Sequence, residues 1–386
     1  MSIRLLADDR SIYNFKPSGS YRGAAPGGDR PAYVRKVFAA AHVVADAQAD
    51  YDPWIDAAID WDATLAFRHH LWSHGFAVAE AMDTAQRGMG LGWDQALELI
   101  TRTAADARQV PGAEIGCGVG TDHLPLGATI KEVISGYLMQ CEAVEAAGGQ
   151  LIVMASRALA AAARGPEDYA RVYGAILSQT REPVVLHWLG PMFDPALAGY
   201  WGSDIVSVAM ANCLSVIRDH ANKIDGIKIS LLDAKLEIEM RRKLPSGVRM
   251  YTGDDFNFPD LIAGDAEGHS DALLGIFDAI APVAAAALAA QALGDTSRFL
   301  DLLHATEPLS RHIFKAPTRF YKTGIVFLAY INGHQDHFTM IGGQQSARSI
   351  VHLCELFRLA DAAGLLADPD DAVARFRPVL AAAGIA

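Results

Sequence analysis

Short apolar segments alternate with helix-like segments along most of this chain, and this alternation limits the folds open to it. The runs LIVMA and PVVL are almost wholly apolar, as expected for strands of a parallel sheet that is covered on both faces. Eight strands alternating with helices are typical of a (β/α)8 barrel, and we predict this α/β fold. The strand-like runs are 37–46, 76–81, 113–118, 151–155, 183–188, 224–230, 248–252 and 269–276.

A doubly wound parallel sheet is the competing architecture for such an alternation. That fold would require a phosphate-binding glycine fingerprint directly after the first strand. The segment after Asp46 reads AQADYDPW and contains no glycine. The glycine-rich run GCGVGTD at 116–122 follows the third strand instead, so we interpret it as a strand end and loop. The barrel is therefore the favoured fold.

The two ends of the chain differ in composition from the middle. Residues 1–34 are polar and rich in Gly and Pro, which predicts an irregular N-terminal extension. The barrel is expected to occupy 35–295. The remaining segment, 296–386, reads as additional helices packed on the barrel.

Composition and charge exclude several classes of function. The 386 residues carry a net charge of −12, and no basic stretch interleaves with aromatics, so nucleic acid is not an expected partner. The longest apolar run, 279–293, is interrupted by Pro282 and predicts a buried helix rather than a membrane span. The N-terminus lacks the apolar core of a signal peptide, so we expect a cytoplasmic protein. Four cysteines without metal or redox spacing indicate neither a disulfide framework nor a metal site, and we expect no cofactor.

The run IDGIKIS at 224–230 places a lysine in the middle of a strand. Alternation puts Ile227 and Ile229 on one face and Lys228 on the other, where it would point into the barrel among small neighbours. A buried ammonium is costly unless it is paired or loses its proton. A deprotonated amine in a dry pocket is the nucleophile that forms Schiff bases with carbonyl compounds. The alternative is a structural lysine paired with a carboxylate such as Asp254.

Barrel enzymes carry their active sites at the carboxyl ends of the strands, which selects further candidates. His187 ends the fifth strand and is a candidate general acid or base, because imidazole titrates near neutrality. The alternative is a core histidine bonded to a backbone carbonyl. Candidates for binding the substrate are Thr84, Thr121, Arg157, Ser230, Asp254 and Asp255.

Three of these candidates have competing structural interpretations. Arg157 would bind a carboxylate or phosphate through two donors, or be a solvated arginine at a helix start. Asp254 and Asp255 would orient Lys228 or bind substrate hydroxyls, whereas an aspartate that caps a helix is the common alternative.

The segment 62–333 resembles the dihydrodipicolinate synthase and N-acetylneuraminate lyase family of Schiff-base-forming barrels. The strongest match is the Gly-Ile-Lys motif within 224–230, and it implies that Lys228 forms the Schiff base. The run YTGDD at 251–255 matches the turn that follows strand seven in that family, and GVGTDH at 118–123 is a weaker match. The resemblance also implies a homo-oligomer, a dimer or a tetramer.

The departures from the family pattern concern the residues that bind substrate. Where the family has a threonine pair after strand two, this chain keeps Thr84 but has Ala85 beside it. His187 stands where the family has a tyrosine, and Ser156 and Arg157 stand where it has another. We therefore predict a lyase or aldolase that acts on a keto acid or a keto-sugar, by C–C cleavage or dehydration, in carbohydrate metabolism.

Two other functions remain open from the sequence. A barrel without catalysis could bind a keto-sugar as a sensor. A sugar isomerase or epimerase would instead bind a divalent metal ion. Its ligands would come from Glu80, Asp122, His123, His187 and Asp254. The pair His334 and His337 in INGHQDHF is a weaker metal candidate.

Overall fold

The structure is a computed structural model that describes residues 1–27, 31–125 and 127–385. Residues 28–30, which belong to the expected N-terminal extension, and residues 126 and 386 lie outside the described part. The chain divides into two compact units. We call 35–40 with 77–274 the barrel unit, and 1–34, 41–76 and 275–386 the helical unit. The predicted division at residues 34 and 295 stays a prediction.

The barrel unit contains a closed ring of parallel strands, so the predicted (β/α)8 fold is confirmed. Consecutive strands are neighbours throughout, and the last strand pairs with the first to close the ring. Closure leaves no exposed sheet edge. The strands are β3 (Val37–Ala40), β4 (Ala77–Glu80), β5 (Ile115–Val119), β6 (Gln150–Val153), β7 (Val184–Leu189), β8 (Ile224–Ser230), β9 (Arg249–Thr252) and β10 (Asp271–Leu274).

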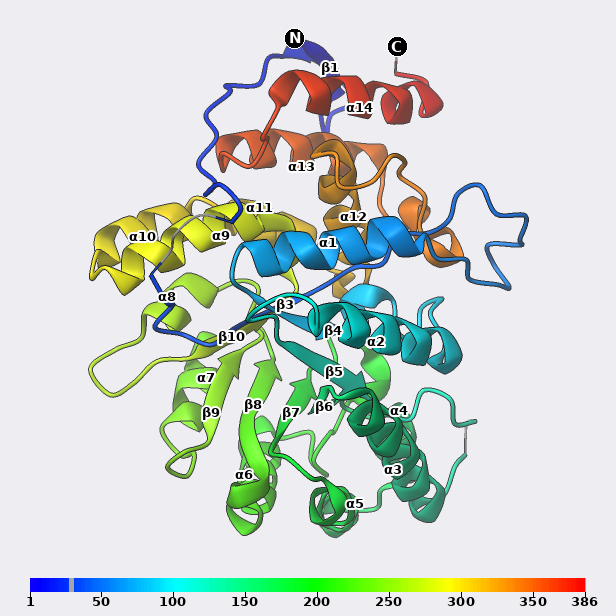
Figure 1. Ribbon diagram of the computed structural model, residues 1–386, viewed down its shortest axis with the longest axis vertical. Coiled ribbons are helices and arrows are strands. Elements are labelled where there is room, and N and C mark those ends of the chain that lie inside the picture. The colour runs from blue at the N-terminus through cyan, green and yellow to red at the C-terminus, as the bar shows by residue number, and fades with distance from the viewer. Residues whose placement is uncertain (28–30, 126, 386) are drawn as a thin grey trace. The chain divides into compact units, whose positions relative to one another are not determined.

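The helices of the barrel unit lie outside the ring of strands, as Figure 1 shows for α3, α5 and α6. The α-helices of this unit are α2 (Trp93–Ala107), α3 (Ile130–Ala147), α4 (Arg157–Ala162), α5 (Pro166–Gln179), α6 (Val206–Asp219), α7 (Ala234–Arg241) and α8 (Phe258–Ala263). Short 3-10 turns are η1 (Asp83–Ala85), η2 (Pro195–Leu197) and η3 (Ala221–Lys223).

Local sequence explains where α3 begins and ends. Thr129 and Glu132 form a capping box in which each side chain accepts a hydrogen bond from the other residue's backbone, so orphan N–H groups of the first turn are satisfied. The helix ends at Gly148, whose φ of 89° is in the left-handed region that glycine tolerates. These two signals define the start and the end of the helix.

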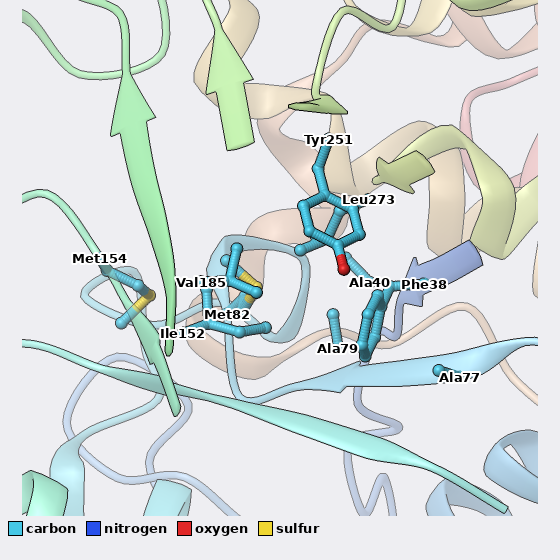
Figure 2. Close-up of a cluster of buried hydrophobic side chains, with 10 residues drawn as sticks. All are labelled: Phe38, Ala40, Ala77, Ala79, Met82, Ile152, Met154, Val185, Tyr251 and Leu273. Carbon is cyan, nitrogen blue, oxygen red and sulfur yellow. The ribbon is translucent and has the colours of Figure 1, made fainter. Parts of the chain in front are cut away.

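Side chains that point inward from alternating strand positions fill the barrel (Figure 2). Gly226 makes room for one of them, because a Cβ at this position would lie 2.7 Å from the ring of Tyr251. The packed interior gives the end of the barrel at which the strands terminate a rigid floor. The cluster consists of Phe38, Ala40, Ala77, Ala79, Met82, Ile152, Met154, Val185, Tyr251 and Leu273.

The helical unit begins with an antiparallel hairpin, β1 (Ile3–Leu6) and β2 (Ile12–Phe15), which corrects the expectation of an irregular N-terminus. Ile3 and Leu5 are buried, and Phe15 packs edge-on against Phe357 at 6.2 Å between ring centroids. The hairpin is ordered because its apolar side chains pack on α13. The helices of this unit are α1 (Trp61–Ser73), α9 (Ile276–Ala292), α10 (Thr296–His304), α11 (Glu307–Ile313), α12 (Lys322–Ile331), α13 (Ile350–Ala362) and α14 (Pro369–Ala382), with turns η4 (Thr318–Phe320) and η5 (Ile341–Ala347).

The alanine-rich run around Pro282 forms α9, and most of that helix is buried. In the part of the chain that the structure describes, no helix combines the length and the apolar character needed to span a bilayer.

Candidate active site

Lys228 lies in the middle of β8 with its side chain on the inward face. It is 7% exposed, whereas Ile227 and Ile229 on the opposite face are almost fully buried. Its partners in the neighbouring strands are His187 on β7 and Tyr251 on β9. Within residues 1–27, 31–125 and 127–385, no carboxylate forms a salt bridge with its ammonium. The predicted alternative of a pair with Asp254 is therefore not seen.

The surroundings of Lys228 favour the neutral amine. Burial lowers the pKa of Lys228 below its ordinary value, because a charged form loses hydration there. The negative charges of Asp255 and Asp83 partly oppose this shift. The result is a lysine that is held near carboxylates and still titrates below an exposed one.

Gly253, in the turn after β9, leaves the space that Lys228 and Ser230 occupy. A Cβ on Gly253 would lie 2.3 Å from Ser230 Oγ and 2.7 Å from Lys228 Cε. Both distances are below the closest approach that real Cβ atoms show. The glycine in the YTGDD run is therefore required by close packing against the Lys228 side chain.

His187 contacts Ser230 on the next strand. The distance from His187 Nε2 to Ser230 Oγ is 3.2 Å, and His187 Nδ1 is buried without a hydrogen-bond partner among the described residues. Burial, and then the charge of Lys228, hold the pKa of His187 well below its ordinary value. The expectation that this imidazole titrates near neutrality does not hold, because the side chain is almost fully buried. His187 is a neutral donor and acceptor beside Lys228.

A cavity opens beside His187 at the carboxyl ends of β4 to β7. It is lined by main chain and side chains from four consecutive strand ends, which is where a barrel carries its active site. Its polar lining comprises Asp83, Arg87, Thr121, Asp122, Ser156, Arg157, His187 and Asp194.

Hydroxyl groups form a connected network that begins at two residues of the cavity lining, Thr121 and Ser156. Thr121 Oγ1 and Ser156 Oγ are 2.5 Å apart, and the Ser156 amide donates to the Tyr200 hydroxyl at 3.1 Å. The Tyr200 hydroxyl in turn lies 2.9 Å from that of Tyr173. Burial raises the pKa of Tyr200 to about 12, so the phenol stays protonated and can donate. Sequence reasoning missed Tyr200, because it lies in an irregular loop far from any strand end.

Arg87 is a buried cation that sequence reasoning also missed. Its Nε and Nη2 atoms bind the carboxylate of Asp122, and Nη2 also donates to Gln140 Oε1 at 3.1 Å. Burial alone would raise the pKa of Asp122, but the hydrogen bonds and charge of Arg87 lower it. The loop that carries Arg87 has two non-glycine residues at positive φ, Ala81 (51°) and Gln86 (65°), a strained conformation typical of functional loops.

The remaining predicted residues occupy different positions around the site. Arg157, the first residue of α4, lines the cavity and forms an ion pair with Asp194. Thr84 is buried within η1 and does not line the cavity. Asp254 accepts hydrogen bonds from the amides of Phe256 and Asn257 at 2.9 and 3.1 Å.

Asp254 is therefore a turn cap, whereas its neighbour Asp255 contributes charge near Lys228. The tandem Gly-Asp-Asp pattern predicts that both carboxylates belong to the site region. The pattern does not indicate which aspartate caps the turn and which acts electrostatically on Lys228.

The residues of the metal-dependent alternative do not converge. Glu80 accepts a hydrogen bond from Thr103 of α2 at 2.7 Å, and Asp122 is occupied by Arg87. Asp254 caps its own turn. Among the described residues, no group of three or more His, Cys, Asp or Glu side chains is arranged to hold a metal ion.

The pair His334 and His337 does not act together either. His334 stacks on His70 in the helical unit with ring centroids 4.2 Å apart. His337 Nδ1 accepts a hydrogen bond from the amide of Thr339 at 3.1 Å. Burial is the main cause that lowers the pKa of His334 to about 4.

Comparison with protein families identifies the chain at the family level. The model for a family described as protein of unknown function (DUF993) matches residues 3–385. The chain belongs to the DUF993 family. A comparison with curated proteins finds no match.

Solved structures similar to this DUF993 chain come from the dihydrodipicolinate synthase family. YagE, a prophage protein of that family from E. coli K12 in complex with pyruvate, has a TM-score of 0.65 at 14% identity, covering 86% of this chain and 100% of that one. The dihydrodipicolinate synthase from Oceanobacillus iheyensis has a TM-score of 0.64 at 14% identity, covering 85% and 96%. The 4-hydroxy-tetrahydrodipicolinate synthase from Methylacidiphilum fumariolicum SolV has a TM-score of 0.64 at 15% identity, covering 88% and 99%. At such low identity the likeness establishes a shared fold, and the resemblance found in the sequence is confirmed at that level.

Proposed function

We propose that this DUF993 chain is a Schiff-base-forming lyase or aldolase that acts on a keto acid or keto-sugar, with Lys228 as the nucleophile. The observation that carries the proposal is the placement of Lys228. It is buried on the sixth strand, has no salt bridge among the described residues, and lies beside the His187–Ser230 pair. The likeness in fold to dihydrodipicolinate synthase-family structures supports the class.

The geometry supplies each part of that chemistry. The neutral amine of Lys228 attacks the carbonyl carbon of the substrate, and loss of water leaves an iminium ion that accepts electrons when a neighbouring bond breaks. His187 and Ser230 form a proton path next to the reacting nitrogen. Thr121 and Ser156, which line the same cavity as His187, present hydroxyls to the substrate.

Further parts of the proposal concern the setting of the enzyme rather than its site. We place the enzyme in the cytoplasm, in carbohydrate metabolism, and as a dimer or tetramer of identical chains. Size-exclusion chromatography with light scattering tests the oligomeric state directly.

Covalent trapping tests the class of reaction. The protein is incubated with a panel of 2-keto acids and keto-sugars, reduced with cyanoborohydride, digested, and analysed by mass spectrometry. We expect an adduct on the peptide that contains Lys228, and none at that position in Lys228→Arg, because a guanidinium is not nucleophilic at neutral pH. The matched control is Lys131→Arg, which changes an exposed lysine on α3 and leaves the Lys228 adduct intact.

Wild-type protein that gains no adduct at Lys228 across the panel, or a Lys228→Arg variant that retains turnover within a few-fold, contradicts the proposal. Insensitivity of turnover to a chelator separates it from the metal-dependent isomerase.

A further inference from the structure

The arginines of the cavity are already paired with aspartates. Arg87 binds Asp122 through two nitrogens and also donates to two backbone carbonyls. Arg157 is paired with Asp194 through its Nε atom. Each guanidinium near the cavity therefore has a carboxylate of its own, and neither is left as an uncompensated cation for a substrate anion.

Asp83, in contrast to these arginines, is a charged residue of the cavity without an ion-pair partner in the described part of the chain. It lines the cavity together with Thr121 and His187, and it is only half-buried. In the described part of the chain its carboxylate accepts no hydrogen bond and forms no ion pair, whereas Asp122 and Asp194 have arginine partners. Lys228 is not among the residues that line this cavity, but its partner on β7, His187, lines it together with Asp83. The charge of Asp83 also raises the pKa of Lys228 against the effect of burial.

The paired arginines and the unpaired Asp83 together constrain which substrate group can lie beside the reacting carbonyl. A 2-keto acid places a carboxylate directly next to the carbon that Lys228 attacks, where it would meet the charge of Asp83, while both arginines of the cavity are already paired with aspartates. A hydroxyl at the same position donates a hydrogen bond to Asp83, and charged acceptors make such bonds strong. The hydroxyls of Thr121 and Ser156 suit further hydroxyl groups of a polyol chain.

We propose that the substrate is an uncharged hydroxyketone, with a hydroxyl on the carbon next to the carbonyl, and that Asp83 is the residue that selects it over a 2-keto acid. The inference rests on the proposed Schiff-base function and narrows its substrate class. Selection works in both directions, because Asp83 attracts the hydroxyl and repels a carboxylate.

The covalent step is balanced with the groups named. The nitrogen of Lys228 forms a bond to the carbonyl carbon, and the carbon–oxygen double bond breaks. One amine hydrogen and one proton from solvent leave with the oxygen as water. The iminium nitrogen keeps one hydrogen and a positive charge, which Asp83 and Asp255 stabilise.

Hydroxyacetone and pyruvate are matched probes for the test, since they share a three-carbon methyl ketone and differ in a hydroxymethyl against a carboxylate. Each is incubated with the full chain at equal concentration and trapped with cyanoborohydride. The adduct on Lys228 is divided by that on the exposed Lys131 in the same digest, which corrects for the intrinsic reactivity of each ketone. We expect hydroxyacetone to exceed pyruvate by about tenfold or more in this ratio, a size that charge repulsion in a partly desolvated site produces.

Two variants locate the source of the preference. Asp83→Asn keeps the shape of the side chain and removes the charge, so we expect the preference to fall severalfold, chiefly through faster labelling by pyruvate. Glu142→Gln removes an exposed carboxylate from α3 and should leave the preference unchanged. Circular dichroism confirms that both variants are folded, and the wild-type ratio tests the inference even if Asp83→Asn is not.

The outcomes separate this inference from the function on which it rests. Preferential labelling of Lys228 by pyruvate, or a preference for hydroxyacetone that Asp83→Asn leaves unchanged, overturns the role of Asp83 and leaves the Schiff-base class intact. Labelling of Lys228 by neither ketone, nor by any compound of the wider panel, overturns the proposed function and this inference together.

Discussion

Two regions of the barrel unit contribute to the candidate site in different ways. The strand β8 and the turn at Gly253 place Lys228 by regular alternation and close packing. The loop after β4 places Asp83 and Arg87 by an irregular path with positive φ at Ala81 and Gln86. In the proposed mechanism the first region supplies the nucleophile, and the second supplies the charges around the substrate. The comparison suggests that chemistry and specificity are encoded separately, and the following changes test it.

The largest effect on stability should come from the loop region. Arg87 is 4% exposed, and replacing it by Met leaves the carboxylate of Asp122 without its partner. The Arg87 side chain is 2% exposed and that of Asp122 is 19% exposed, so the carboxylate left behind keeps contact with solvent. Losing hydrogen bonds between charged groups of this kind costs about 1.5–3 kcal/mol. The midpoint of urea unfolding, followed by tryptophan fluorescence, measures the loss. Arg102→Met, which breaks an exposed pair on α2, is the control and should shift the midpoint little.

The pH dependence of the same variant has a defined sign. Arg87 lowers the pKa of Asp122 in the folded state, so its contribution to stability is present above the ordinary carboxyl pKa and is lost as the pH falls through the lowered value. The difference in the free energy of unfolding between wild type and Arg87→Met should therefore become smaller at acidic pH. If this difference in unfolding free energy stays constant as the pH falls, packing rather than charge explains the loss of stability.

A smaller loss is expected in the strand region from Gly253→Ala. The added methyl group would overlap Ser230 Oγ and Lys228 Cε, and overpacking of this kind costs about 1–3 kcal/mol. Because the displaced atoms include the lysine side chain, we also expect slower adduct formation at Lys228. Gly165→Ala is the matched control, since the only close neighbour of a Cβ there is the flexible end of Glu167.

The same two regions show how much of the molecule could be predicted from sequence. The bounds predicted for β8 coincide with the structure, because the alternation of side chains along a strand is a local signal. Lys228 was selected because strand alternation and a family motif agree on it. The confirmed barrel follows from the same alternation repeated along the chain.

The features that the sequence did not predict have equally specific causes. β3 ends at Ala40, although the apolar run that predicts it continues to residue 45. An apolar sequence indicates burial, but it does not indicate whether the backbone is hydrogen-bonded in a strand. The hairpin of β1 and β2 depends on burial against α13, more than 300 residues away in the chain. Arg87, which lines the cavity, and Tyr200, which accepts a hydrogen bond from the Ser156 amide, lie on irregular loops, where no periodicity indicates the direction of a side chain.

The turn after β9 should tolerate a conservative change at one aspartate and not an apolar one. Asp254→Ala removes the acceptor of two backbone amides and should cost about 1 kcal/mol, the usual effect of losing a cap. Asp254→Asn keeps an acceptor oxygen and should restore most of that stability. Thermal unfolding of the two variants measures the difference. Equal stability of both, with loss of adduct formation in both, would instead assign Asp254 to substrate binding.

The neighbouring aspartate provides the finest test of the charge environment of Lys228. Asp255 opposes the effect of burial on the pKa of Lys228, so Asp255→Asn should lower that pKa further. More neutral amine is then present at a given pH, and the alkaline rise in the rate of adduct formation should move to lower pH. A pH series of cyanoborohydride trapping from about 6 to about 11 measures the shift, because the ordinary lysine pKa of about 10.4 lies inside that range. Asp254→Asn, whose charge does not act on Lys228, should leave the profile in place. A shift to higher pH, or equal shifts in both variants, would mean that the turn acts on Lys228 through its conformation rather than through the charge of Asp255.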